Sequence, residues 1–161
     1  MINLSKKKLF LTIFLISFIA LISAYFIEYV LGYQPCNLCL YERVPYFLAI
    51  LIFLVNFKYN KFEKHFIFFL IIIFFIATLL SLYHLAIEQG LIEESLLCNL
   101  EKGTNIIDKD EILKQLQQKN ISCKDVTFQI FGLSLTSYNI IISILLTITL
   151  IRFYFGYENS R

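Results

Sequence analysis

Long uncharged apolar runs are the feature that most constrains this chain of 161 residues. A run of roughly 18 or more apolar residues is long enough to cross the hydrocarbon core of a bilayer as a helix. The overall composition agrees, because 58% of the residues are hydrophobic and only 16% are charged, which is unusual for a soluble domain. We therefore expect an all-α integral membrane four-helix bundle, with spans at about residues 9–27, 40–57, 66–87 and 138–155.

Basic residues gather at one set of span ends. Three lysines precede the first span, three more lie in the link between the second and third spans, and Arg152 and Arg161 follow the fourth. The positive-inside tendency then predicts that both termini are cytoplasmic. Residues 28–39 and 88–137 form two outer loops, and residues 88–125 carry eight acids against five lysines. We expect one transmembrane domain over residues 1–161, with membrane lipid around it and no nucleic acid partner.

The second outer loop is too long for a simple turn and too short for a soluble domain with its own core. Asp108 followed by Glu111 is typical of a capping box, and an apolar stripe follows through residues 110–119. We expect a short amphipathic helix on the membrane surface there. The alternative is a solvated helix that only spaces the cysteines of this loop. Residues 128–135 are apolar and are expected at the interface before the last span.

All four cysteines fall in the expected outer loops. Cys36 and Cys39 form a Cys-x-x-Cys pair, whereas Cys98 and Cys123 are far apart in sequence. Four cysteines allow three pairings. Because two intervening residues gain almost nothing from loop closure, while such pairs recur where thiolates are stabilised and exchanged, we favour a redox role for the first pair. For the second pair, the spacing leaves a redox and a structural role equally open.

A zinc site is the other common interpretation of a Cys-x-x-Cys pair. Such sites use four nitrogen or sulfur ligands, often as two close pairs. Here the second pair is widely spaced, and we expect neither His65, on the cytoplasmic side, nor His84, within the third span, to lie near a cysteine. No metal is therefore predicted.

Arg43 follows the Cys-x-x-Cys pair by one helical turn. If a helix begins near Leu40, Cys39 lies at its N-terminal edge and Arg43 on the same face, so that both the helix end and the guanidinium favour a thiolate at Cys39. The arginine could also donate to a carbonyl oxygen of a lipid-soluble acceptor. The alternative is an interfacial arginine that reaches for the headgroups. Pro45 is expected in the first turns of that helix, where a missing N–H is tolerated.

His84 and Glu88 are four residues apart near the outer end of the third span. An ionisable residue inside a membrane is a functional hypothesis by default. The pair could pass protons to a reduced acceptor, or the two side chains could simply satisfy each other at the interface.

Residues 35–46, Pro-Cys-Asn-Leu-Cys-Leu-Tyr-Glu-Arg-Val-Pro-Tyr, resemble the signature of the bacterial DsbB family of disulfide-generating membrane proteins. The resemblance extends along the chain. Its weaker matches are Tyr83-His84 with Glu88 and Gly90, the pair Cys98 and Cys123, residues 131–135, and Tyr138-Asn139.

This resemblance implies a protein of the bacterial inner membrane that oxidises a periplasmic thioredoxin-fold dithiol protein of the DsbA type. The electrons would pass to a membrane quinone, either ubiquinone or menaquinone. By position, Cys98 would form the mixed disulfide with the partner, and Cys123 would be its mate and would exchange with Cys36. Cys39 would face the quinone ring, with Arg43 beside it. His84 is a further residue expected at the quinone.

Two rival interpretations differ in what they predict. A non-catalytic membrane scaffold with two structural disulfides predicts that Cys36 and Cys39 resist mild reductant and that nothing depends on quinone. A relative of the vitamin K epoxide reductase-like group would usually carry its Cys-x-x-Cys late in the chain, whereas here it lies near the start.

Overall fold

The computed structural model describes residues 2–58, 63–93, 98, 122–124 and 128–158. Its elements are α1 (Ile2–Tyr29), α2 (Asn37–Tyr41), α3 (Val44–Lys58), α4 (Glu63–Glu88), β1 (Gln129–Ile130), β2 (Leu133–Ser134) and α6 (Leu135–Glu158).

Four helical stretches in this part of the chain are long and apolar enough to cross a membrane, which confirms the predicted helical membrane fold. They are Lys8–Tyr29, Asn37–Phe57, Lys64–Glu88 and Leu135–Gly156. Each is slightly longer than its predicted span. The amphipathic helix predicted at residues 110–119 lies outside the described residues.

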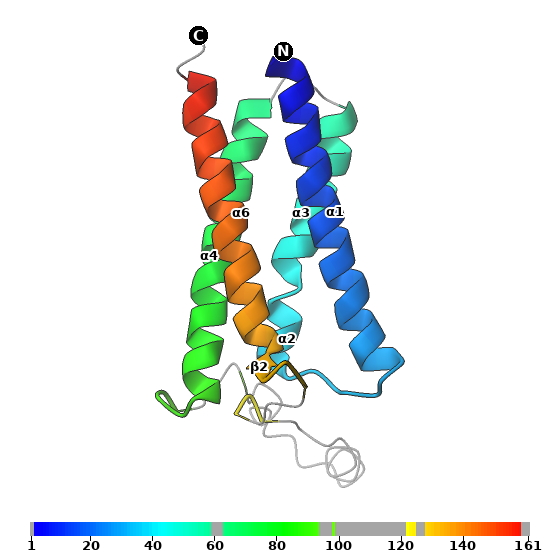
Figure 1. Cartoon of the computed structure of the whole chain (residues 1–161), viewed down its shortest axis with the longest axis vertical. Coiled ribbons are helices and arrows are strands. Elements are labelled where there is room, and N and C mark those ends of the chain that lie inside the picture. The colour runs from blue at the N-terminus through cyan, green and yellow to red at the C-terminus, as the bar shows by residue number, and fades with distance from the viewer. Residues whose placement is uncertain (1, 59–62, 94–97, 99–121, 125–127, 159–161) are drawn as a thin grey trace, which may run out of the picture.

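The long helices form a bundle in which α4 packs along α6, α1 packs along α3, and α3 also contacts α4. Both chain termini lie at one end of this bundle, as an even number of spans requires (Figure 1). The α1–α2 connection, α2 and the hairpin of β1 and β2 lie at the other end, which we call the cysteine end.

An apolar core fills the half of the bundle nearer the termini and extends to Tyr46, near the start of α3. Close van der Waals packing of these side chains stabilises the bundle. Lipid tails are as apolar as the side chains, so burial between helices gives no further hydrophobic gain. Side chains such as Phe18, Phe69 and Leu145 are instead exposed on the outside of the bundle, as expected for a surface that faces lipid. The apolar core consists of Phe10, Ile13, Tyr46, Ala49, Ile67, Leu70, Phe74, Leu146 and Leu150.

The second span is interrupted, and this corrects the prediction of one helix beginning near Leu40. The short helix α2 ends at Tyr41, a turn follows at Glu42 and Arg43, and α3 begins at Val44. Pro45 explains the break, because it has no N–H to donate to the carbonyl of Tyr41 and its ring would clash with that group in a continuous helix. Pro45 itself sits in the first turn of α3, as predicted.

Helix α4 ends at the cysteine end in a glycine cap. The N–H of Leu91 donates to the carbonyl of Ala86, and the N–H of Gly90 donates to that of Ile87, both at 2.9 Å. Gly90 has a φ of +72°, which only glycine adopts without strain. This cap stops the helix directly after Glu88 and so fixes His84 and Glu88 in its last turns.

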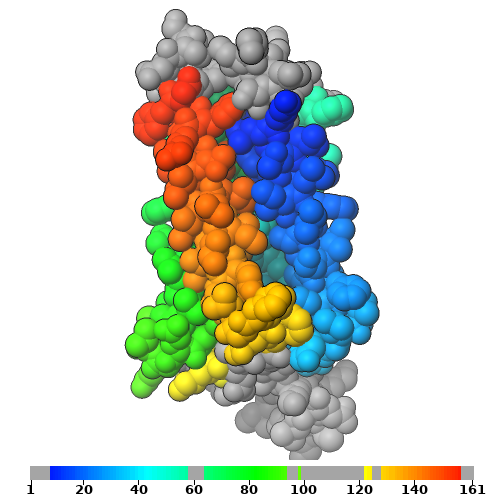
Figure 2. Space-filling model, in the orientation of Figure 1, coloured from blue at the N-terminus to red at the C-terminus, as the bar shows by residue number. Residues whose placement is uncertain are grey.

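A tight hairpin forms within residues 128–135, which we expect at the interface before the last span. Its strands β1 and β2 are antiparallel, with Ile130 opposite Leu133. Phe131 and Gly132 at the tip both have positive φ angles, which a two-residue hairpin turn of the primed type requires. Figure 2 shows this segment, in gold, against both α6 and the end of α1, and the Tyr138 hydroxyl donates to the carbonyl of Ile130.

Candidate functional site

All four cysteines meet at the cysteine end. Cys36, Cys98 and Cys123 are buried together with Leu38 and Ile87, and Cys39 packs against this group. Loop closure therefore brings the two sequence-distant pairs into one cluster. A disulfide joins Cys98 to Cys123, which is the pairing that the family resemblance implies, whereas Cys36 and Cys39 are free thiols.

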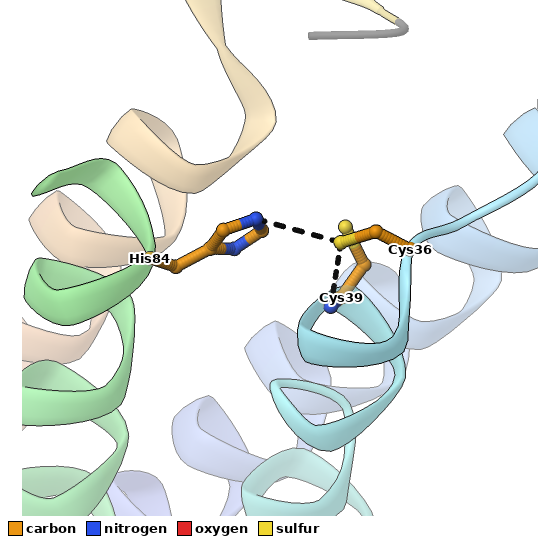
Figure 3. A group of neighbouring side chains, drawn as sticks. All are labelled: Cys36, Cys39 and His84. Carbon is orange, nitrogen blue, oxygen red and sulfur yellow. Dashed lines mark hydrogen bonds between the residues drawn. The ribbon is translucent and has the colours of Figure 1, made fainter. Parts of the chain in front are cut away.

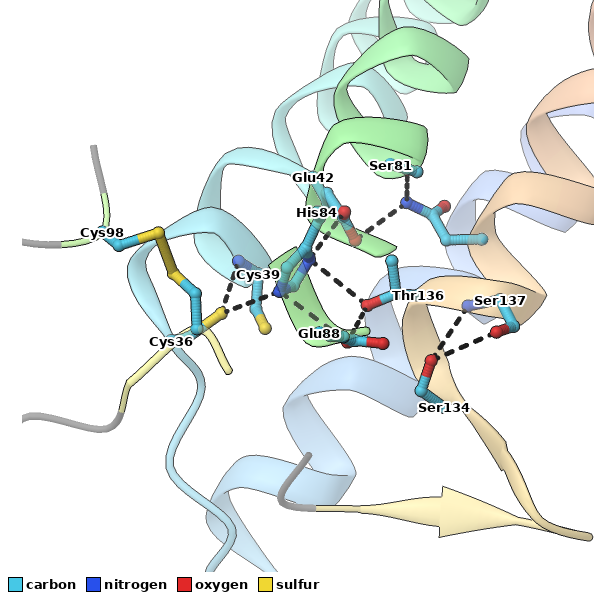
Figure 4. Close-up of polar contacts among 12 residues, drawn as sticks. Cys36, Cys39, Glu42, Ser81, His84, Glu88, Cys98, Ser134, Thr136 and Ser137 are labelled. Atoms are coloured by element: carbon cyan, nitrogen blue, oxygen red, sulfur yellow. Dashed lines mark hydrogen bonds and ion pairs between the residues drawn. A yellow bond between two sulfur atoms is a disulfide. The ribbon is translucent and has the colours of Figure 1, made fainter. Parts of the chain in front are cut away.

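The second pair is held against the first by a side chain between Cys36 and Cys39. The amide Nδ2 of Asn37 donates to the backbone carbonyl of Cys98 at 3.2 Å. Figure 4 shows the disulfide bond of Cys98 next to Cys36, and the second cysteine of that bond, Cys123, belongs to the same buried cluster. The close approach means that a thiolate released from one pair needs little movement to reach the other.

The first pair is shaped by the start of α2. Cys36 is the residue that precedes the helix, and its sulfur accepts a hydrogen bond from the backbone N–H of Cys39 at 3.2 Å. Nε2 of His84 lies 3.4 Å from the same sulfur, in the buried space between α2 and α4 (Figure 3). Cys36 thus has two nitrogen groups directed at its sulfur.

These contacts favour the ionised form of Cys36. The hydrogen bond from the Cys39 thiol lowers the pKa most, and burial opposes it. The hydrogen bond and charge of His84 lower it further, so that the pKa of Cys36 falls to about 5. A thiol with this pKa is largely thiolate at neutral pH, the form that attacks disulfides. The sequence favoured a thiolate at Cys39 instead, and that assignment stays a prediction.

The position of His84 corrects one step of the sequence reasoning. No histidine was expected near a cysteine, yet ligand atoms of Cys36, Cys39 and His84 all lie within 4.8 Å of one another. Two sulfurs and one imidazole are donors that soft metal ions accept. The distance of the histidines from the cysteines therefore no longer argues against a metal. The expectation that no metal binds stays a prediction.

Glu42 is the residue of this site that the sequence reasoning missed. It lies in the turn between α2 and α3 and is only 8% exposed. Its Oε1 is 2.9 Å from Nδ1 of His84, and its Oε2 accepts from Nδ2 of Asn139 at 3.0 Å. Asn139 also donates to Ser81, at 2.7 Å (Figure 4). A carboxylate within an apolar stretch, three residues after Cys39, was the signal that could have identified it.

The predicted pair of His84 and Glu88 is present but loose. Nε2 of His84 lies 3.8 Å from Oε1 of Glu88, beyond hydrogen-bond distance. Thr136 lies between them, because its hydroxyl donates to Glu88 at 2.6 Å and lies 3.2 Å from Nδ1 of His84. Glu42 is therefore the carboxylate in direct contact with the imidazole.

Arg43 points to the other side of the turn, towards α1. Its Nη1 donates to Oε2 of Glu28 at 2.5 Å, and its guanidinium lies 5.0 Å from the ring centroid of Tyr25. These two contacts hold the charge at the membrane boundary. Helix α2 ends at Tyr41 and α3 begins at Val44, so Arg43 lies in the break between them. Cys39 and Arg43 therefore do not share the unbroken helical turn that the sequence predicted.

A cavity of about 360 Å³ lies between α1, the start of α3 and α6, and we call it the α1–α6 cavity. Its apolar wall comes mainly from α1, and Ile130 of the hairpin also borders it. Arg43 also borders a second, larger hollow of about 900 Å³ on the opposite side, between α1 and α3. Among the described residues, Cys39 borders neither space. The polar lining of the α1–α6 cavity includes Glu42, Arg43, Tyr46, Tyr138 and Asn139.

Comparison with known proteins gives a consistent result. The family model described as "Disulfide bond formation protein DsbB" matches residues 6–153. An uncharacterized protein of Rickettsia prowazekii is 35% identical over 150 residues, covering 89% of this chain and 85% of its own length. The SPbeta prophage-derived disulfide bond formation protein B of Bacillus subtilis is 28% identical over 106 residues, covering 66% of this chain and 68% of its own.

No solved structure gave a significant match to the chain. The family match nevertheless spans both halves of the cysteine cluster and all four membrane-spanning helices. The chain therefore belongs to the DsbB family and is a membrane oxidoreductase that forms disulfide bonds.

Proposed function

We propose that this protein reoxidises a periplasmic dithiol protein of the DsbA type and passes the electrons to a membrane quinone. The observation that carries the proposal is the meeting of two cysteine pairs, one closed and one open, in a single buried cluster. A structural scaffold has no need of a free thiol pair that lies beside a disulfide and has an imidazole in contact with one of its sulfurs. Cys36, Cys39, Cys98 and Cys123 are the proposed catalytic residues.

The exchange between the pairs follows from thiol chemistry. A partner thiolate attacks the sulfur of Cys98 and releases Cys123, and the partner's second thiolate then resolves the mixed disulfide. Cys123 attacks Cys36 of an oxidised first pair, which releases Cys39. Closure of the Cys98–Cys123 bond then leaves the first pair reduced. The closed second pair and open first pair in the structure match this last state.

The α1–α6 cavity has the chemistry that a quinone needs. A bound quinone supplies an acceptor for two electrons and two protons. At the polar end, Arg43, Tyr46 and Asn139 offer N–H and O–H groups that could hold the ring oxygens. The apolar wall on α1 would accommodate the isoprenoid tail. Because Cys39 does not border this cavity among the described residues, the proposal requires the head group to reach past the Glu42–Arg43 turn.

The proposed orientation places both termini in the cytoplasm and the cysteine end in the periplasm of a bacterial inner membrane. The lysines near the first and third helices support it, since basic residues favour the cytoplasmic side. The oxidising periplasm is also the compartment in which a Cys98–Cys123 disulfide would persist.

Replacement of Cys39 by serine tests this function directly. Full-length protein in lipid nanodiscs is supplied with ubiquinone and a reduced thioredoxin-fold dithiol protein, and oxidation of the dithiol and reduction of the quinone are followed together. Cys39→Ser should abolish both, because the first pair can no longer carry two electrons. Thr149→Val is the matched control, since the Thr149 hydroxyl only donates within its own helix.

Unchanged turnover in Cys39→Ser would refute the enzyme assignment. Dithiol oxidation that proceeds without any quinone would instead keep the exchange reaction and reject the quinone. A first pair that stays oxidised under mild reductant, with no turnover at all, would favour the scaffold.

A further inference from the structure

We propose that Glu42 is the proton carrier of the first cysteine pair: a proton that leaves Cys36 crosses the His84 ring and is released from Glu42 into the α1–α6 cavity. The transfer from Cys36 to Glu42 concerns only side chains of this chain. The release into the cavity rests on the proposed function, which places the electron acceptor there.

The three side chains form an unbroken line of contacts. The sulfur of Cys36 is 3.4 Å from Nε2 of His84, and Nδ1 on the opposite side of the ring is 2.9 Å from Oε1 of Glu42. The imidazole thus lies between a nucleophilic sulfur and a carboxylate, with one ring nitrogen facing each. An imidazole that accepts a proton at one nitrogen can give up the proton on the other, so the ring can pass a proton from sulfur to carboxylate.

Glu42 is positioned to deliver that proton beyond the ring. The carboxylate borders the α1–α6 cavity, whereas among the described residues neither Cys36 nor His84 does. Its Oε2 is fixed by Asn139, and the Tyr46 hydroxyl donates to Oδ1 of that same amide. Both neighbours also border the cavity. A buried carboxylate is costly unless it is hydrogen-bonded, and here Asn139, itself bonded to Tyr46, holds one oxygen at the cavity wall while His84 contacts the other.

The charged groups around His84 leave Glu42 as the better acceptor. Glu88 is 3.8 Å from Nε2, shares Thr136 with the ring, and is not among the residues that border the cavity. Arg43 is next to Glu42 in sequence, but its guanidinium is paired with Glu28. The carboxylate of Glu42 is thus balanced mainly by the imidazole, which makes it responsive to proton movement at His84.

The proton balance fits the oxidation of the pair. When the Cys36–Cys39 disulfide closes from the thiolate form of Cys36, the S–H bond of Cys39 breaks, one S–S bond forms and two electrons leave for the quinone of the proposed function. The first proton is the one that Cys36 has already given up to Nε2 of His84, and the ring loses its charge when Nδ1 transfers a proton to Oε1 of Glu42. The second comes from the Cys39 thiol, whose sulfur lies within 4.8 Å of both the Cys36 sulfur and a ring nitrogen of His84 and so can use the same route.

The first test needs no quinone. Full-length protein in quinone-free nanodiscs is cycled between reduced and oxidised dithiothreitol, and the reduced-minus-oxidised infrared difference spectrum is recorded. A carbonyl band of a protonated carboxylic acid should change with the redox state. It should disappear in Glu42→Gln and persist in Glu88→Gln, the matched carboxylate control. The same band in Glu42→Gln, or its loss in Glu88→Gln alone, would overturn the proposal.

The second test separates proton delivery from thiol exchange. With ubiquinone present, oxidation of the pre-reduced first pair should slow about 100-fold in Glu42→Gln, the usual contribution of a positioned proton-transfer group. Its solvent deuterium isotope effect should rise, and Glu42→Asp should recover part of the rate. Exchange with the dithiol partner in quinone-free protein should stay within about twofold of wild type.

The outcomes distinguish the two proposals. A Glu42→Gln protein that oxidises its thiols at the wild-type rate, or loses thiol exchange to the same extent, overturns the proton route. A wild-type protein that reduces no quinone but shows the Glu42 infrared band overturns the proposed function and leaves the transfer from Cys36 to Glu42 standing.

Discussion

The residues of helix α4 that face the inside of the bundle lie in two different environments. Towards the chain termini they are Ile67, Leu70 and Phe74, all almost fully buried in the apolar core. Towards the cysteine end the same spacing carries Ser81 and His84, equally buried, but each in hydrogen bonds with residues of other helices. The same helix therefore supports packing at one end and, in the proposed mechanism, proton and sulfur chemistry at the other.

Helix α6 repeats this division. Leu150 and Leu146 belong to the apolar core, and Asn139 and Thr136, towards the cysteine end, contact Glu42 and His84 respectively. Polar side chains inside a membrane protein are costly and often functional. Ser143 and Thr147 are also buried on α6, but the contacts with Glu42 and His84 lie at the cysteine end, where we propose that the function is located. The apolar half provides a rigid support, and substitutions in the two halves should therefore have different effects.

Replacing Arg43 by alanine should have a larger effect on the chemistry than replacing either His84 or Leu70. The KM for quinone should rise about 30-fold, equivalent to about 2 kcal/mol for a hydrogen bond from a charged donor. Quinone titrations of dithiol oxidation measure it, with Arg43→Lys as the charge-retaining control. A lower kcat at unchanged KM would place Arg43 in the chemistry of the cysteine end and not in quinone binding.

Replacing His84 by glutamine should shift the pH profile of Cys36. In the wild type, alkylation of Cys36 by iodoacetamide should be nearly independent of pH above about pH 6 and fall as the pH drops through about 5, where the thiolate is protonated. Without the imidazole the pKa rises, so the fall should move to higher pH. The rate at about pH 6 should then be roughly tenfold lower, since each pKa unit above the ambient pH costs a factor of ten.

Mass spectrometry of the Cys36 peptide from reduced protein gives these rates. Ser81→Ala provides the control, because it removes a buried polar group from the same helix without touching the sulfur. An unshifted profile in His84→Gln would mean that the Cys39 thiol alone controls Cys36.

Replacing Leu70 by alanine should have the smallest effect on the chemistry. The cavity left in the apolar core should lower the free energy of unfolding by about 3 kcal/mol, as for other buried leucines. Turnover per folded molecule should stay within about twofold of wild type. Unfolding in mixed detergent measures the first, and the quinone-coupled assay the second. A large loss of turnover at full folding would show that the two halves of α4 are not independent.

The four helices could be predicted from hydropathy because each span is long and lipid provides no alternative partner for its backbone. The break at Glu42 and Arg43 could not, since Pro45 is equally compatible with the first turn of a helix and with an interruption just before it. The hairpin was missed because Phe131 adopts a positive φ that is rare for a bulky side chain. No local sequence pattern predicts this conformation of Phe131.

The residues of the site likewise divide into those that the sequence identifies and those that it does not. The Cys-x-x-Cys pair, Arg43 and His84 stand out in the sequence because each is chemically unusual for its position. Glu42 did not, because its role depends on which residues face it across the bundle, and His84 and Asn139 lie 42 and 97 residues further along the chain. Pattern reasoning identifies reactive residues, whereas the partners that tune them come from tertiary contacts.

The bond from Asn37 to the Cys98 carbonyl has a kinetic consequence. It holds Cys98 close to the first cysteine pair. Disulfide exchange between the two pairs is therefore an intramolecular reaction with a high effective concentration. Such a step follows first-order kinetics, so its rate does not depend on the concentration of the protein in the membrane. Only the encounter with a diffusing partner would then depend on abundance.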